Sequence, residues 1–301
     1  MPLKFVVIAA GVTLGLLLGA CTASGSKVVP SSTTLAPLVE ATTTTTEGPT
    51  TATLPPTTTT TLPPNDCVVG TPPASLTAEG FYTRHCSVLG LDVVAAEEVS
   101  PEAVTATADR VYWMLVLRPD LVEALQATPI RIAVIGAEQR ITSLPDFEEL
   151  YDLYPGTDWR RLGRSFPGTD LITVAAAAEE NLLCFDGDRY GGEDIFVRDF
   201  ARTIRRFGLA VADANTHTAI ERSYARAIAG GLWEDAVGEV NSDQYWAEGS
   251  QAYFDANGEA DPPDDVHNHV DTREELLDYD RPLFDLAQSL YGDLDWRPTC
   301  P

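Results

Sequence analysis

An α+β fold, mostly helical with a small sheet, is predicted for one globular domain over residues 65–301. Three observations indicate this class: apolar residues recur at helical spacing, a β-branched run ends at a glycine, and strand-like segments lie between helical ones. The segment is long enough for one sizeable core or two small ones. No second break in composition divides it, so we expect a single domain.

The first half of this domain should contain two helices and two strands. Residues 101–118 have apolar side chains at helical spacing, and a short helix beginning at Pro119 follows them. The β-branched run 130–136 predicts a central strand that Gly136 closes, and residues 169–174 predict a second strand. The stretch 154–168 is rich in glycine and proline and predicts a long structured loop.

The second half should be helical. Residues 193–209 predict a helix with one apolar stripe, made of Phe196, Phe200, Ile204 and Phe207. Further helices are expected over residues 219–229, 242–254 and 273–290. We expect Tyr245, Trp246, Tyr253 and Phe254 to lie in the core or line a cleft.

Residues 1–20 are typical of a signal peptide. Lys4 precedes an apolar stretch, Phe5 to Leu18, that is too short to cross roughly 30 Å of hydrocarbon. The ending Leu-Gly-Ala-Cys21 resembles the lipobox of bacterial lipoproteins, in which the cysteine is lipidated and becomes the mature N-terminus. An ordinary secretory signal cleaved after Ala20 is the alternative. The resemblance implies a lipid anchor on Cys21 at the extracytoplasmic face of the cell membrane.

Residues 21–64 predict a disordered stalk. Threonine and proline dominate this segment, which includes the runs Thr42 to Thr46 and Thr57 to Thr61. Such a composition buries too little apolar surface to offset the entropy of ordering. The whole chain has a formal charge of −25 and two lysines, Lys4 and Lys27. Nucleic acid is therefore excluded as a partner, because a negative surface repels phosphate.

Four cysteines remain once Cys21 carries a lipid. An even number in an oxidising compartment predicts two disulfides, for which three pairings exist. The short loop between the first two favours Cys67–Cys86, and this leaves Cys184–Cys300.

Two segments resemble an extracytoplasmic zincin-like family. Residues 194–204 read Asp-Ile-Phe-Val-Arg-Asp-Phe-Ala-Arg-Thr-Ile, and the corresponding helix of the family reads His-Glu-Phe-Ala-His. Residues 245–255 begin Tyr-Trp-Ala-Glu-Gly, as in the family. The segments 180–184, 261–263, 267–270 and 272–276 also match. The likeness covers about residues 81–301 and implies a gluzincin architecture, similar to the catalytic domain of anthrax lethal factor.

The helix departs from the family where zinc would bind. In zincins two histidines at i and i+4 bind zinc, the intervening glutamate is the general base, and a later glutamate is the third ligand. Arg198 and Arg202 occupy the two histidine positions, Asp199 the base position and Glu248 the third-ligand position. A guanidinium has no lone pair to donate to a metal. We therefore expect no zinc, no other cofactor and no intact catalytic centre.

The two arginines need a partner, because like charges at i and i+4 repel each other. We expect Glu248 to bridge both guanidiniums, and the alternative is that both arginines point into solvent. His267 and His269, two residues apart, are weak candidates for metal binding. The adjacent pairs Glu179–Glu180 and Glu193–Asp194 do not suit a glycosidase, since neighbouring carboxylates usually diverge.

Three functions remain open for a domain of this kind. The first is a non-catalytic pseudo-peptidase that binds a peptide, cell-envelope material or a partner protein. The second is a hydrolase with a relocated site that uses Asp199, Glu248, His267 or His269. The third is a purely structural surface protein.

Overall fold

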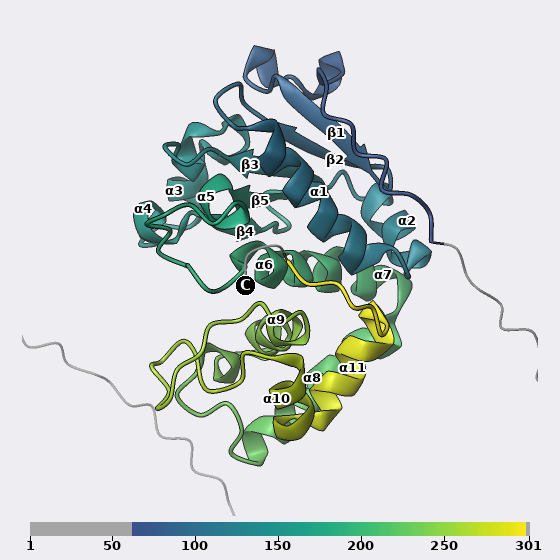
Figure 1. Ribbon diagram of the computed structural model, residues 1–301, viewed down its shortest axis with the longest axis vertical. Helices are drawn as coiled ribbons and strands as arrows, with labels where there is room; N and C mark the ends of the chain where they lie inside the picture. Colours follow the sequence, from purple (N-terminus) through teal and green to yellow (C-terminus); the bar gives the residue numbers. More distant parts are fainter. Residues whose placement is uncertain (1–61, 299–301) are drawn as a thin grey trace, which may run out of the picture. The chain divides into compact units, whose positions relative to one another are not determined.

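The computed structural model describes residues 62–298, in which helices are combined with a small sheet (Figure 1). This part of the chain confirms the α+β class. The signal peptide, Cys21 and all but the last residues of the expected stalk lie outside the described residues, as does Cys300.

The sheet has five strands in the order β1-β2-β3-β5-β4. The three inner strands, β2, β3 and β5, are parallel, and the two edge strands pair antiparallel with their neighbours. The bounds are β1 Arg84–Val88, β2 Leu91–Ala95, β3 Arg131–Ile135, β4 Ser165–Pro167 and β5 Val174–Ala178.

Each face of the sheet is covered by its own core, because successive side chains of a strand point to opposite faces. Val93, Ile132 and Ala175 belong to the larger core, which includes the helices. Val94, Ala133 and Ala176 belong to a smaller core under the short helical turns that follow β3. Burial on both faces is expected of parallel strands.

The predicted strand over residues 130–136 is confirmed as β3, whereas the one over residues 169–174 is wrong. The strand in this region is β5, which begins only at Val174. It consists mostly of alanine, which has low strand propensity, so the sequence hardly indicates a strand there. The expected loop 154–168 contains α4 (Trp159–Leu162) and the edge strand β4. The β1–β2 hairpin was not predicted. It turns through Leu89 and Gly90, both at positive φ.

Two helices expected from their spacing, α1 (Pro101–Leu115) and α2 (Pro119–Ala127), are confirmed. Short helical segments complete this half of the chain: Ala74–Leu76, Ala78–Gly80, Ile141–Ser143, Pro145–Phe147, α3 Leu150–Leu153 and α5 Glu179–Leu182.

The central helix α6 (Ile195–Thr203) packs against β4 on one side and against α9 (Ser242–Tyr253) on the other. It continues through a π-helical segment, Ile204–Leu209, and a final turn, α7 (Ala210–Ala212). Figure 1 shows α6 between the sheet and the group formed by α8 to α11. This placement brings residues of α6 and α9 together.

The remaining helices are α8 (Ala214–Ala229), a short turn Val237–Glu239, α10 (Arg273–Tyr279) and α11 (Arg281–Tyr291). The single helix expected over residues 273–290 is interrupted at Asp280, whose side chain accepts a hydrogen bond from the Leu283 amide and begins α11. Pro282 suits this second start, since its missing N–H is not needed there.

The disulfide Cys67–Cys86 is present, as predicted, and joins the incoming chain to β1. Cys300, the predicted partner of Cys184, lies outside the described residues, so the second disulfide stays a prediction. Between residues 62 and 298, no helix combines the length and the apolar character needed to cross a bilayer.

Candidate functional site

The start of α6 is fixed by a buried ion pair. The Asp194 carboxylate caps the helix by accepting hydrogen bonds from the amides of Phe196 and Val197. Its other oxygen accepts a hydrogen bond of 2.5 Å from Nε of Arg110 in α1, and both side chains are buried. A carboxylate with three donors is well satisfied, which sets the position and rotation of α6.

The two faces of α6 have different environments. Phe196, Phe200 and Ile204 are fully buried, which confirms the expected apolar stripe. Arg198, Asp199 and Arg202 lie on the polar face, and both arginine side chains are mostly covered, at 21% and 25% exposed. The alternative in which both arginines point freely into solvent is therefore wrong.

Arg198 pairs with Glu248 of α9, as expected. Nε of Arg198 lies 3.5 Å from Oε1 of Glu248, whose side chain is only 1% exposed. The other carboxylate oxygen accepts a hydrogen bond of 3.2 Å from Asn257. The glycine after Glu248 lets α11 come close, since a β-carbon at Gly249 would collide with Leu283.

Arg202 has a different partner from the one expected. Its Nη1 lies 3.1 Å from Oδ1 of Asp199, one turn earlier on the same helix. The second oxygen of Asp199 accepts a hydrogen bond from the Ser165 hydroxyl of β4. Glu248 therefore does not bridge both guanidiniums, because Asp199 offers Arg202 a carboxylate at i−3.

Two further residues, His267 and Glu193, complete what we call the charged cluster, which consists of Glu193, Arg198, Glu248 and His267. Nε2 of His267 lies 3.7 Å from Oε1 of Glu193, and Nδ1 lies 4.0 Å from Oε2 of Glu248. Sequence reasoning did not connect these residues, since no local spacing joins them. His269 lies elsewhere, with its ring edge-to-face against Tyr279.

Burial and charge shift the pKa values of the cluster. Burial raises the pKa of the Glu248 carboxyl, against the positive charges of Arg198 and His267. Contact with Glu193 raises the pKa of His267 despite its partial burial, and the charges of Glu248 and Asp264 add to this rise. Burial lowers the pKa of Arg198, but the negative charges of Glu248, Asp199 and Glu193 outweigh it and raise the pKa. The guanidinium therefore stays charged.

These residues do not fit a zinc ion. Nε2 of His267 faces Glu193, whereas Nδ1 faces Glu248. A histidine binds a metal ion through one of its nitrogens, so His267, Glu193 and Glu248 cannot all bind the same ion. Within residues 62–298, no group of three or more histidine, cysteine, aspartate or glutamate side chains has the geometry to hold a metal. Neither arginine can replace a ligand.

A cavity of about 300 Å³ lies beside the polar face of α6, and we call it the β4–α6 cavity. Its floor includes Arg198, Asp199 and Arg202, and Ser165 and Phe166 contribute from β4. Aromatic side chains form much of the remaining wall: Tyr154, Trp159, Phe166 and Tyr190. The cavity thus joins a charged floor to an aromatic wall.

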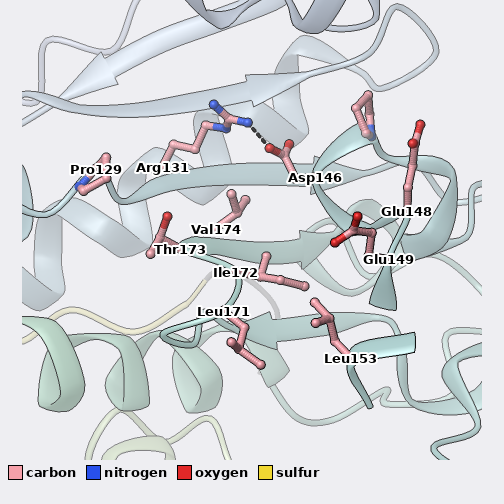
Figure 2. A pocket seen from close by; sticks show the side chains of 11 residues that line it. Pro129, Arg131, Asp146, Glu148, Glu149, Leu153, Leu171, Ile172, Thr173 and Val174 are labelled. Atoms are coloured by element: carbon pink, nitrogen blue, oxygen red, sulfur yellow. Dashed lines mark hydrogen bonds and ion pairs between the residues drawn. The ribbon is translucent and has the colours of Figure 1, made fainter. Parts of the chain in front are cut away.

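A second cavity, of about 460 Å³, lies at the beginning of β3 and β5 (Figure 2). Arg131 points toward Asp146 there and pairs with it, and Asp146 also accepts a hydrogen bond of 2.5 Å from Tyr82. This cavity shares no lining residue with the β4–α6 cavity. Its lining has one arginine against three carboxylates, Asp146, Glu148 and Glu149, and no aromatic ring, which makes it the weaker candidate.

The paired acidic residues have structural partners. Glu179 accepts hydrogen bonds from the amides of Ser100 and Ala137, whereas Glu180 pairs with Arg164. Glu193 faces His267, while Asp194 caps α6. Neither pair has two carboxylates facing one another, as a glycosidase would need.

No family model matches the sequence, and no curated protein matches it. The likeness to zincin-like proteins therefore stays a prediction from the residues quoted above.

Proposed function

We propose that this chain is a lipid-anchored extracytoplasmic protein with a zincin-like domain, a pseudo-peptidase that binds peptide without cleaving it. The ligand would lie in the β4–α6 cavity. The membrane would hold the protein through a lipid on Cys21.

The ion pair between Arg198 and Glu248 carries this proposal. In the proposed zincin-like domain, this pair would join the first metal-ligand position of the helix to the third. A guanidinium supplies positive charge there, but it cannot lower the pKa of a bound water as zinc does. Asp199, at the base position, is already engaged by Arg202 and Ser165. A hydrolytic water would thus have neither a metal nor an uncommitted base.

The cavity supports binding of a peptide more than of a polysaccharide or a flat protein surface. Ligand pockets combine apolar and aromatic walls with a few polar groups, and about 300 Å³ is at their small end. That volume suits one or two amino-acid residues. The charged floor can meet backbone or terminal groups while the aromatic wall meets a side chain.

The test is to incubate the purified full chain with zinc and labelled peptide pools, and to measure metal content, binding and cleavage. We expect no stoichiometric zinc, saturable peptide binding and no new peptide ends. Cleavage that requires Asp199 or His267 would favour the relocated hydrolase instead. Absence of binding to peptides and to cell-envelope fractions would favour a purely structural protein.

A further inference from the structure

We propose that the β4–α6 cavity recognises the free carboxyl end of a peptide whose last side chain is apolar. This inference rests on the peptide binding proposed above and specifies which part of a peptide is bound.

The charge of the cavity floor indicates an anionic group. Two guanidiniums, Arg198 and Arg202, lie there with one carboxylate, Asp199. Each guanidinium has one carboxylate partner, Glu248 for Arg198 and Asp199 for Arg202, so the site is neutral overall. Glu248 is buried and does not line the cavity, so the lining residues themselves carry two positive charges and one negative charge. A ligand carboxylate would therefore meet a cavity lining that carries more positive than negative charge.

Unpaired hydrogen-bond donors of the lining residues also favour an anionic ligand group. Two buried nitrogens of lining residues have no hydrogen-bond acceptor within the described part of the chain, Nε of Arg202 and Nε1 of Trp159, whereas Nε of Arg198 faces Glu248. Buried donors are normally paired, so a ligand rich in acceptors is favoured here. A carboxylate has two oxygens and matches the fork of a guanidinium, whereas a mid-chain peptide group offers one carbonyl.

The wall of the cavity indicates what precedes that carboxylate. The rings of Trp159 and Tyr154 lie 6.0 Å and 6.3 Å from that of Phe166, so the three form one continuous apolar surface. Leu162 lies beside them and is 43% exposed. Covering this surface with an apolar side chain is favourable, while a charged one would lose hydration.

The experiment compares two pools of fluorescein-labelled pentapeptides, randomised at four positions and ending in phenylalanine as either the free acid or the amide. Fluorescence anisotropy with the full chain should show the acid pool binding at least about ten times more tightly, because the amide lacks a charge-assisted hydrogen bond and a factor of ten corresponds to about 1.4 kcal/mol. The change Arg202→Gln should weaken the acid pool about ten-fold and so remove its advantage over the amide pool.

Arg206→Gln is the matched control. Arg206 belongs to the π-helical segment, pairs with Asp170 and Asp243, and does not line the cavity, so its loss should change neither pool. Equal binding of acid and amide would overturn this inference and leave peptide binding intact. Binding of neither pool would overturn both. A preference for the acid that survives Arg202→Gln would place the carboxylate elsewhere and also overturn the inference.

Discussion

Among single residues, Glu248 occupies the most constrained environment of the site. Its carboxylate is almost fully buried, and Arg198, His267 and Asn257 all approach it. Removal of one member of a buried ionic group strands the others, so the energy of the pair is best measured as a coupling.

We expect a double-mutant cycle of Glu248→Gln and Arg198→Met to give a favourable coupling of about 1–3 kcal/mol in urea unfolding. The reason is that Arg198 pairs with a carboxylate that water does not reach. The control cycle uses Arg281 and Asp285, an exposed pair on α11, which should couple by about 0.3–0.5 kcal/mol. A value for the buried pair no larger than the control would mean that Arg198 and Glu248 are energetically independent.

His267 should make stability depend on pH. Its folded pKa is raised, so its contribution is present below about pH 6.5 and is lost as the pH rises through the folded value. Glu248 acts in the same direction, since burial also raises its pKa and ionisation becomes costly on folding. The carboxylates whose negative charges raise the pKa of His267 are those of Glu193, Glu248 and Asp264.

Urea unfolding of the wild type should therefore show a lower free energy of unfolding at pH 8 than at pH 6, and His267→Gln should reduce this difference. His217→Gln is the control, because His217 lies in α8 and has no ion pair in residues 62–298. If the free energy of unfolding of His267→Gln depends on pH as in the wild type, protonation of His267 does not contribute to stability.

Only some of the contacts in the site could be predicted from the sequence. The pairing of Arg198 with Glu248 followed from the family pattern, which places one residue on each of two facing helices. The pairing of Arg202 with Asp199 was missed, although they are i and i+3 on one helix, because a zinc site was used as the template. Contact between His267 and Glu193 depends on the path of the loop after α9, for which no sequence period exists.

Among the elements, α6 connects the two halves of the domain. Amphipathic spacing predicted it well, as it did α1. Helix α9 is buried on all sides over residues 245–253, so its N-cap was the clearer signal. Strands β4 and β5 gave no such signal, since three residues are too few for a period and alanine has weak strand propensity. The break between α10 and α11 depends on one capping residue, Asp280, inside an otherwise helical pattern.

The beginning of α6 should be sensitive to loss of its cap. Asp194→Ala removes two capping hydrogen bonds and leaves Arg110 buried without its carboxylate, so we expect a loss of about 3–5 kcal/mol in unfolding free energy. Asn241→Ala removes the cap of α9, where no ion pair is involved, and should cost about 1 kcal/mol. Equal losses in both variants would show that the ion pair with Arg110 adds nothing.

The relation between α6 and α9 can be tested by restoring the family pattern. The triple change Arg198→His, Asp199→Glu and Arg202→His puts two histidines one turn apart, with Glu248 facing the first of these positions. We expect isothermal titration to show one zinc ion per chain. Arg198→His alone is the control and should bind zinc far more weakly. If the triple variant binds no zinc, the two helices are not arranged as in a zincin.

At the scale of the whole molecule, the structure describes the domain, whereas the prediction of an anchor depends on the sequence alone. Residues 62–298 account for the domain, its core and its cavities, whereas the proposed anchor depends on residues before them. The strong negative charge makes anionic lipid headgroups a poor second contact. Membrane association would thus depend on the lipid alone.

Cys21→Ser should release the protein from membranes or leave its precursor uncleaved, because serine cannot form the thioether that carries the lipid. Fractionation of cells that express the wild type and the variant measures this directly. Cys67→Ser is a suitable control, as it alters the disulfide and leaves the lipobox intact. Normal cleavage with unchanged membrane association in Cys21→Ser would overturn the anchor.

The Cys67–Cys86 disulfide would have a further consequence if the proposed lipid anchor holds the protein at its N-terminal end. Any pull along the tether reaches the domain near Pro63, whose carbonyl accepts a hydrogen bond from Tyr112, and then meets the bridge at Cys67. The covalent bond passes this tension directly to Cys86, in the middle of β1. The residues between the two cysteines would therefore carry no load, and a pull on the proposed tether would not separate them from the domain one hydrogen bond at a time.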